Sequence, residues 1–346
     1  MRRDRPRAVV VGTTFGAHYA RALAGPYSPV ELVGVAGTGG QAGRHLAAEL
    51  GVRYLAGTDE IESAGAGLAV VAVRSAIVGG QGDEICRDLL GRGIPVLQEL
   101  PVHSADVVRS ARAAQRSGAA FAVTGFYEHL EPVRRFIAAA RALDAVSPVT
   151  GVELRTSIQV LHASLGVLSR ILTAPPGPDF AVHPAAATAK SLVSTDWGGV
   201  AVDVLVRNGY DARTPDDDCQ PLMGFVLGTP DGELSLAHVH GPTRWEPRLH
   251  EEAPGRLRHP EQRLSHLFGP DHWTGDTVFP GLWAEGIARA VGGFAEAVSA
   301  GRRPLGQRDL AALRHWEAVS ARLGRPADVP SVPPKLINIH DLEVCS

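Results

Sequence analysis

Side chains that can transfer protons follow an apolar segment near residue 100. The segment ends in Glu99 and Leu100, and His103 follows three residues later. Histidine can act as a general acid or base because its pKa lies near neutrality. Leucine cannot exchange a proton, and the only two lysines, Lys190 and Lys335, are distant in sequence. This segment therefore offers acid–base chemistry without a lysine, and we expect His103 to begin a helix more readily than to act as an acid.

A second group of candidates comes after the next apolar segment. Tyr127 lies within Gly125–His129, and a tyrosine hydroxyl there could donate a proton to a substrate. The alternative is a partly buried tyrosine between two domains. His129 and His162 could face a substrate. However, a histidine next to a charged residue is more often solvated, and one among leucines is more often packed in a core.

The N-terminal segment contains the glycines of a possible phosphate-binding turn. A dinucleotide-binding turn needs glycine because the backbone approaches a pyrophosphate, which then lies at the N-terminus of the next helix. The match to G-x-G-x-x-G is imperfect, and a tight turn without a ligand is the alternative. Its position after the first apolar segment favours binding. The candidate cofactor residues are Gly12, Thr13, Thr14, Phe15 and Gly16.

The end of the second apolar segment favours NADP over NAD. NAD sites usually place an acid there, where it binds the ribose 2′-hydroxyl. The segment Gly37–Gln41 has no acid, so Thr38 and its glycine neighbours leave room for a 2′-phosphate that Arg44 could bind. The alternative is that Arg44 is a solvated helix residue.

The first 125 residues alternate short apolar runs with helical patterns. This alternation predicts a parallel, doubly wound α/β sheet covered on both faces, of the Rossmann type. Ser104 is the expected N-cap of the fourth helix. Strands are expected at 8–12, 30–36, 68–73, 95–98 and 119–124, and helices at 16–23, 41–50, 83–90 and 104–116.

Beyond residue 125 the pattern changes to helices with alternating strands, which predicts an α+β domain with a mostly antiparallel open sheet. We therefore expect two domains, residues 1–125 and 126–346, with the ligand between them and the C-terminal helices packing back on the first. Helices are expected at 130–143, 160–172, 283–299 and 308–323, strands at 149–156, 200–206, 222–227 and 234–240, and loops at 173–178, 211–218 and 256–266, with a hairpin turn at Asp231 and Gly232.

Composition excludes several classes of protein. The chain has 346 residues, a net charge of -3 and 45% hydrophobic residues, without an apolar run long enough to cross a membrane. A charge this close to zero gives no reason to expect a nucleic-acid partner. Three distant cysteines predict neither a disulfide framework nor a zinc site, so we expect no metal. A cytoplasmic protein is the expectation.

Four segments together resemble a known family. These are Gly12–Gly16, Val73–Gly82, Val96–His103 and Phe126–Tyr127. They resemble the thiazolinyl imine reductases, a siderophore-pathway branch of the glucose-fructose oxidoreductase, inositol dehydrogenase and MocA superfamily. The resemblance is specific to about residue 135. It implies NADPH-dependent reduction of a thiazoline C=N to a thiazolidine, on an intermediate carried by a nonribosomal peptide synthetase carrier domain.

The resemblance also implies roles for particular residues. In the superfamily a lysine follows the glutamate of Glu-x-Pro, and in the imine reductases a histidine commonly stands there. This chain departs from both with Leu100, which moves the proton-donor role to Tyr127, a match to a family tyrosine beside the nicotinamide. His103 is a further catalytic candidate, and His129 and His162 join Tyr127 as substrate-binding candidates. The resemblance adds Val73, Arg74, Ser75, Glu99 and Leu100 to the cofactor contacts.

Two other functions are compatible with the sequence. One is an NADP-dependent oxidoreductase of the same superfamily that acts on a small carbonyl compound, although the absent lysine counts against alcohol oxidation. The other is a noncatalytic NADP-binding protein. An open antiparallel sheet often buries its free face in a dimer, so we expect a homodimer by analogy of fold.

Overall fold

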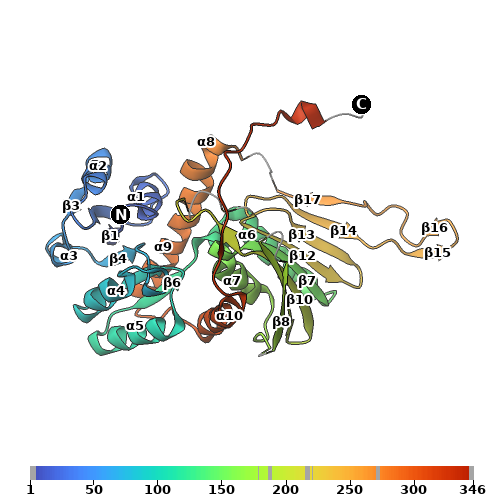
Figure 1. The fold of residues 1–346 in the computed structure, drawn as a ribbon, viewed down its shortest axis with the longest axis horizontal. Coiled ribbons are helices and arrows are strands. Elements are labelled where there is room, and N and C mark those ends of the chain that lie inside the picture. Colours follow the sequence, from blue (N-terminus) through green and yellow to red (C-terminus); the bar gives the residue numbers. More distant parts are fainter. Residues whose placement is uncertain are drawn as a thin grey trace.

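The computed structural model describes residues 5–177, 179–185, 189–214, 219, 221–269 and 273–342. Two β-sheets organise these residues, one in each half of the chain, and Figure 1 shows them side by side with helices between and around them. The predicted boundary near residue 125 falls between the last strand of the first sheet and the first helical turn of the second half.

The first sheet has six strands in the order β3-β2-β1-β4-β5-β6, and every pairing is parallel. Because helices cover both faces, the central strands β1 and β4 are buried apolar runs, apart from Arg7 at the start of β1. The order reverses between β1 and β4, and this reversal opens a crevice at the carboxyl ends. The strands are β1 (Arg7–Val11), β2 (Glu31–Ala36), β3 (Arg53–Leu55), β4 (Leu68–Val71), β5 (Val96–Glu99) and β6 (Phe121–Thr124).

The helices of this domain begin close to the predicted positions. Ser104 is the first residue of α5, but the N-cap is His103, so the predicted cap is wrong by one residue. The imidazole replaces the expected hydroxyl because its Nδ1 accepts a hydrogen bond from the Ala105 N–H at 3.2 Å. The helices are α1 (Gly16–Ala24), α2 (Gln41–Glu49), α3 (Asp59–Ser63), the 3-10 turn η1 (Ala76–Val78), α4 (Gly82–Gly91) and α5 (Ser104–Ser117).

The second sheet has eight strands in the order β17-β14-β13-β12-β7-β10-β9-β8, and only the β7–β10 pair is parallel. The predicted fold class is therefore confirmed. The strands are β7 (Gly151–Ser157), β8 (Phe180–Ala185), β9 (Lys190–Trp197), β10 (Val200–Arg207), β12 (Met223–Thr229), β13 (Gly232–Leu236), β14 (Thr243–Pro247) and β17 (His266–Phe268), with two small pairs, β11 (Gly209–Tyr210) with β18 (Ala327–Asp328) and β15 (Glu251–Ala253) with β16 (Arg256–Leu257).

Helices cover one face of this sheet and leave the other exposed. Along β10 the buried residues Val202 and Val204 alternate with exposed Asp203 and Leu205. A six-residue π-helix leads into α9, which packs against α1 and runs between the two domains (Figure 1). The helical elements are η2 (Phe126–His129), α6 (Glu131–Asp144), η3 (Ile158–Val160), α7 (Leu161–Ile171), α8 (Gly275–Thr277), the π-helix η5 (Val278–Trp283), α9 (Ala284–Ser299), α10 (Gln307–Leu323) and η6 (Ile339–Leu342).

Several local expectations were wrong in the second half. Strands β8 and β9 were not predicted, because their polar and small residues give little apolar alternation. The expected loop 256–266 contains β16 and the start of β17. The hairpin turn is confirmed between β12 and β13, although Gly232 already belongs to β13. Part of the predicted loops 173–178 and 211–218 lies outside the described residues. No described helix is long and apolar enough to span a membrane.

The first turn gives a matched pair of glycine substitutions. Gly12 has φ +116°, and a Cβ there would lie 2.5 Å from the carbonyl oxygen of Ala72. We expect Gly12→Ala to lower the free energy of unfolding by about 2 kcal/mol or more. A Cβ on Gly16 would lie 3.5 Å from its nearest neighbour, an ordinary contact. Gly16→Ala should therefore change stability by less than about 1 kcal/mol. Urea unfolding tests both, and equal stability of the two variants would contradict the steric argument.

Candidate active site

The carboxyl ends of the parallel strands bring most of the predicted cofactor residues to one edge. The turn at Gly12 follows β1, and Val73–Ser75 follow β4. Glu99 is the last residue of β5, Leu100 comes directly after it, and Tyr127 follows β6. Residues from four separate segments thus border the crevice where a dinucleotide fold binds its ligand.

The turn after β1 is shaped by backbone contacts. The Gly12 N–H donates to the Ala36 carbonyl at 2.9 Å, and Phe15 is the N-cap of α1. No side chain caps α1 and no acid lies in its first turn. A helix N-terminus without an anionic partner of its own can bind a pyrophosphate, and the assignment of Thr13, Thr14 and Gly16 to the cofactor stays a prediction.

The loop after β2 contains an aromatic residue that the sequence analysis missed. The Tyr54 hydroxyl oxygen accepts a hydrogen bond from the Gly39 N–H at 2.7 Å. The Arg44 guanidinium carbon lies 5.4 Å from the centre of the Tyr54 ring, within cation–π range. Thr38 beside them is exposed. Arg44 is an exposed cation, and this loop contains no acid that would neutralise it, so the arrangement is compatible with a phosphate on the ribose. The contact between Arg44 and Tyr54 could not be predicted from the sequence.

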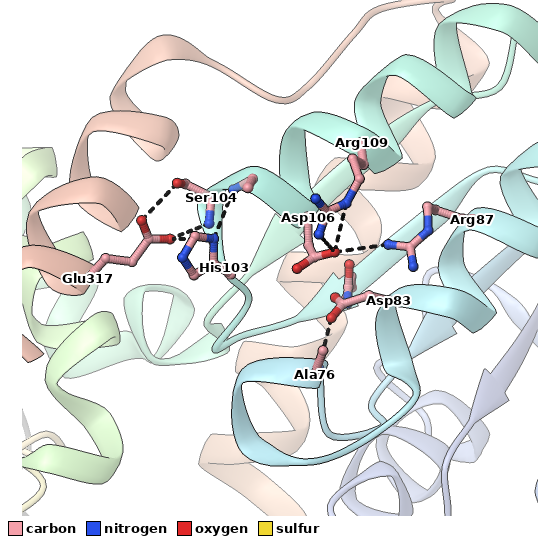
Figure 2. Close-up of polar contacts among 10 residues, drawn as sticks. Ala76, Asp83, Arg87, His103, Ser104, Asp106, Arg109 and Glu317 are labelled. Atoms are coloured by element: carbon pink, nitrogen blue, oxygen red, sulfur yellow. Dashed lines mark hydrogen bonds and ion pairs between the residues drawn. The ribbon is translucent and has the colours of Figure 1, made fainter. Parts of the chain in front are cut away.

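Three hydrogen bonds connect the loop after β4 and the start of α4 to the C-terminal end of β5 and the residues that follow it. Ser75 Oγ donates to the Pro101 carbonyl at 2.5 Å. The carboxylate of Asp83 accepts a hydrogen bond from the Ala76 N–H at 2.8 Å (Figure 2). It also accepts one from Gln98 Nε2 at 2.8 Å. Asp83 and Gln98 are buried, so these bonds are shielded from water. The two family-like segments around residues 75 and 99 are therefore held together by these bonds. Asp83 was not among the predicted residues.

The N-terminus of α5 is held by a carboxylate from the end of the chain. Figure 2 shows Glu317 of α10 accepting hydrogen bonds from the backbone N–H and, at 2.8 Å, the hydroxyl of Ser104. His103 Nδ1 lies 3.5 Å from the same carboxylate. His103 is thus a residue at the start of a helix, as expected, and its nitrogen is engaged in capping. Its assignment as a catalytic group stays a prediction.

A further ion-pair cluster joins α4 to α5. Asp106 accepts hydrogen bonds from Arg87 at 3.1 Å and from Arg109 at 2.5 Å (Figure 2). The carboxylate side chain is largely buried, whereas Arg109 is more than half exposed. These contacts fix the helix pair that packs beneath the strand ends.

Glu99 is paired with a tyrosine of α1. The fully buried Tyr19 donates its hydroxyl hydrogen to the Glu99 carboxylate. Burial raises the pKa of Glu99 to about 8, and the hydrogen bond from Tyr19 opposes part of this shift. Burial and the neighbouring Glu99 raise the pKa of Tyr19 well above its usual value. Tyr19 was missed by the sequence analysis. Its position three residues after Gly16 places it one helical turn from the glycine turn.

Leu100 points between the domains. Its Cδ1 lies 3.7 Å from the position that a Cβ on Gly125 would occupy, a position that is also 3.6 Å from Ala163 of α7. Leu100 thus packs with the core where β6 meets the second domain. Its side chain contributes packing and no acid–base group.

Tyr127 belongs to an aromatic cluster between the domains. Its ring stacks on Phe126 at 4.5 Å between centroids and meets Trp283 edge-on at 5.9 Å. Trp283 also lies 6.3 Å from Phe15 of the glycine turn. Tyr127 is 8% exposed, so the structure agrees with a nearly buried tyrosine between domains, and its proton-donor role stays a prediction. We call Phe15, Tyr19, Phe126, Tyr127 and Trp283 the aromatic cluster.

The two other histidine candidates are buried to different degrees. His129 pairs with Glu128 at 3.5 Å, and burial lowers its pKa. His162 is 7% exposed, its ring lies 6.0 Å from that of Trp316, and burial lowers its pKa to about 4. Both are therefore neutral at pH 7. The placement of His162 agrees with the packing alternative, and substrate binding by either residue stays a prediction.

Comparison with known proteins assigns the first domain. Residues 6–125 match the GFO_IDH_MocA model, described as an oxidoreductase family with an NAD-binding Rossmann fold. Residues 6–125 belong to this family. The superfamily-level resemblance is confirmed, and the GFO_IDH_MocA domain supplies an NAD(P)-binding fold of the oxidoreductase type. No curated protein matches the chain.

Solved structures with a similar fold cover most of the chain. An oxidoreductase from Agrobacterium radiobacter in complex with NAD+, L-tartaric acid and magnesium has a TM-score of 0.69 and 10% identity, covering 91% of this chain and 95% of its own. UDP-N-acetylglucosamine 3-dehydrogenase from Acidithiobacillus ferrooxidans has a TM-score of 0.67 and 14% identity, covering 90% and 95%. GenD2 of gentamicin A biosynthesis, in complex with NAD, has a TM-score of 0.64 and 19% identity, covering 93% and 95%. At such identities the likeness shows the fold alone.

The described residues contain no group of three or more His, Cys, Asp or Glu side chains that could hold a metal ion. The cofactor that the GFO_IDH_MocA domain is built to bind is a nicotinamide dinucleotide. Such a cofactor supplies the redox chemistry, whereas the protein binds it, orients it and sets the electrostatics around it.

Removal of the Glu317 carboxylate tests the cap on α5. We expect Glu317→Ala to lower the free energy of unfolding by about 1 kcal/mol, because the N-terminus of α5 loses its hydrogen-bond acceptors. Glu317→Gln keeps one acceptor oxygen and should lose less. Glu296→Ala, on the exposed face of α9, is the control and should have little effect. Urea unfolding measures all three, and an alanine variant as stable as the glutamine variant would disprove the cap.

Proposed function

We propose that this protein is an NADPH-dependent reductase that converts a thiazoline C=N to a thiazolidine on a siderophore-type intermediate carried by a nonribosomal peptide synthetase. The observation that carries the proposal is Leu100, packed toward Gly125 and Ala163 where related dehydrogenases place a lysine. The chain's two lysines lie elsewhere, Lys190 on β9 and Lys335 in the C-terminal segment. A site without this base is poorly suited to alcohol oxidation, whereas imine reduction needs only an acid.

The residues at the crevice have separate tasks in the proposed reaction. The bound nicotinamide supplies a hydride when reduced. The turn at Gly12 and the N-terminus of α1 bind its phosphates, and Thr38 and Arg44 bind the phosphate on the ribose. Leu100 and the aromatic cluster exclude water around the reacting carbon. Tyr127 donates its hydroxyl proton to the substrate nitrogen.

The partners follow from the same proposal. The carrier domain delivers the thioester-linked substrate to the crevice between the domains. A homodimer is proposed through the exposed face of the second sheet, on which Glu153, Arg155 and Asp203 point away from the covering helices. The mixed charges of this face would pair across a twofold axis.

Tyr127→Phe tests the proton donor. With a thiazoline thioester mimic, the wild type should consume NADPH, and Tyr127→Phe should do so about 10²-fold more slowly because the acid is lost. The loss of nicotinamide absorbance measures the rate. Tyr27→Phe is the matched control, because Tyr27 is 54% exposed and outside the aromatic cluster.

The same assay separates the alternatives. A wild type that binds NADPH but does not reduce the mimic would overturn the proposal. If it then reduced a small carbonyl compound, it would be a different oxidoreductase of the superfamily. If it reduced neither compound, a noncatalytic NADP-binding role would replace it.

Arg44→Ala tests the choice of cofactor. Loss of a charge-assisted contact to the 2′-phosphate should lower the preference for NADPH over NADH by about tenfold or more. The ratio of the two dissociation constants, measured by calorimetry, reports the change. Arg112→Ala on the exposed side of α5 is the control. An unchanged ratio in Arg44→Ala would remove Arg44 from the cofactor site.

A further inference from the structure

The loop between β13 and β14 carries two histidines that the proposed reaction does not use. Strand β12 starts beside the end of β7 and beside the end of β13, because it runs antiparallel to both. The loop therefore leaves the second sheet at the edge where β7 leads into η3 and α7. His238 and His240 lie in this loop, and both side chains are half-buried.

The loop contacts the elements that surround Tyr127. The Trp283 indole Nε1–H donates a hydrogen bond to His240 Nε2 at 3.1 Å. The Trp283 ring also meets that of Tyr127 edge-on, at 5.9 Å between centroids. Farther along the loop, a Cβ on Gly241 would lie 3.6 Å from Pro132 of α6, the helix that follows η2. His240 and Tyr127 are thus neighbours of the same indole ring between the domains.

The bond from Trp283 fixes the position of the hydrogen on His240. An indole nitrogen can only donate, so Nε2 of His240 is the acceptor and carries no hydrogen. Burial, helped by the neighbouring His238, lowers the pKa of His240 to about 4, and the imidazole is therefore neutral at pH 7. A neutral imidazole with an unprotonated Nε2 has its hydrogen on Nδ1. Nδ1 of His240 is consequently a hydrogen-bond donor.

This donor is not used within the described part of the chain. No described residue accepts a hydrogen bond from Nδ1 of His240, and this nitrogen is not among the buried polar atoms without a partner, so solvent reaches it. The neighbouring His238 is engaged elsewhere, because its own Nδ1 accepts a hydrogen bond from the His240 backbone N–H at 3.4 Å. An accessible donor beside an aromatic ring is the kind of group that orients a ligand in a mostly apolar site.

We propose that His240 is a specificity-determining residue of the reductase and that its Nδ1–H binds a carbonyl oxygen that the substrate carries next to its C=N group. The inference rests on the proposed function, which supplies such an oxygen. In a thiazoline built from a cysteinyl thioester, the ring nitrogen and the thioester carbonyl are attached to the same carbon atom. Tyr127 then donates to the nitrogen and His240 to the carbonyl oxygen. Trp283 acts through His240 and is a positioning residue.

The fixed hydrogen also gives the site a direction of selectivity. Nε2 of His240 is occupied by Trp283, and Nδ1 can only donate. A ligand group with an oxygen acceptor gains a hydrogen bond here, whereas a group that lacks an acceptor leaves the Nδ1–H without a partner. The site therefore favours thiazolines that carry a carbonyl over thiazolines that do not.

The first experiment measures binding without turnover. Wild-type protein saturated with NADP+ is titrated by calorimetry with a thiazoline methyl ester, whose carbonyl is next to the ring nitrogen, and with the same thiazoline carrying a methyl group in place of the ester. The wild type should bind the ester about tenfold more tightly, and His240→Ala should lose this preference, because one hydrogen bond is removed. An equal affinity of the wild type for both compounds overturns the proposal.

Two further variants separate the hydrogen bond from the fold of the loop. His240→Asn keeps an N–H donor close to the position of Nδ1 and should retain most of the preference for the ester. His250→Ala, which removes an exposed histidine from the segment after β14, is the control and should keep all of it. A preference that survives in His240→Ala overturns the role of His240.

The second experiment determines the tautomer directly. Nitrogen chemical shifts of protein with labelled histidines should show His240 at pH 7 with its hydrogen on Nδ1. Trp283→Phe keeps a ring but removes the indole N–H, so the hydrogen should redistribute toward Nε2 and the preference for the ester should fall. A wild-type His240 with its hydrogen on Nε2 overturns the proposal.

The outcomes separate this proposal from the reductase. A wild type that prefers the ester but oxidises NADPH with neither compound overturns the reductase and leaves His240 as a carbonyl-binding residue. A wild type that reduces the thiazoline ring and binds both compounds equally overturns the role of His240 and leaves the reductase standing. A wild type that binds neither compound overturns both.

Discussion

The six strands of the first sheet run in one direction, so their carboxyl ends all meet at a single edge. This constraint brings the turn at Gly12, the loop at Ser75, the strand end at Glu99 and the turn at Tyr127 together, although they are far apart in the chain. The second domain then covers that edge with α7, α9 and η5. Every feature of the candidate site depends on this convergence.

Two kinds of interaction fix the edge, and they lie on opposite sides of β5. On the α4 side, Asp83 binds Ala76 and Gln98, and the structure gains rigidity from a carboxylate whose oxygens both have partners. On the α1 side, Glu99 has a single hydroxyl partner, and burial therefore favours its neutral form. Of these two adjacent residues, Gln98 thus contacts a structural carboxylate on one side of the strand, and Glu99 has a carboxyl group with a raised pKa on the other.

The C-terminal third of the chain completes the site from a distance. Glu317 of α10 caps α5 across 213 residues, and Trp283 enters the aromatic cluster from the π-helix before α9. A cap satisfies backbone N–H groups that the helix itself cannot bond, and the large rings bury area that neither domain could bury alone. The same packing contacts therefore set both the relative placement of the two domains and the shape of the crevice between them.

The sequence by itself determined the alternation of strands and helices in the first domain, the glycine turn and the absence of a lysine at Leu100, because these are properties of local order and residue type. Strands β8 and β9 were not predicted because their burial comes from neighbouring strands and helices. Backbone geometry made His103, and not Ser104, the N-cap of α5. Only the tertiary structure decided that Tyr19 meets Glu99, that Arg44 lies over Tyr54 and that Glu317 reaches Ser104. The spacing of apolar residues in the sequence predicts which face of a helix or strand is buried, but the partner of a polar side chain depends on how the elements pack in three dimensions.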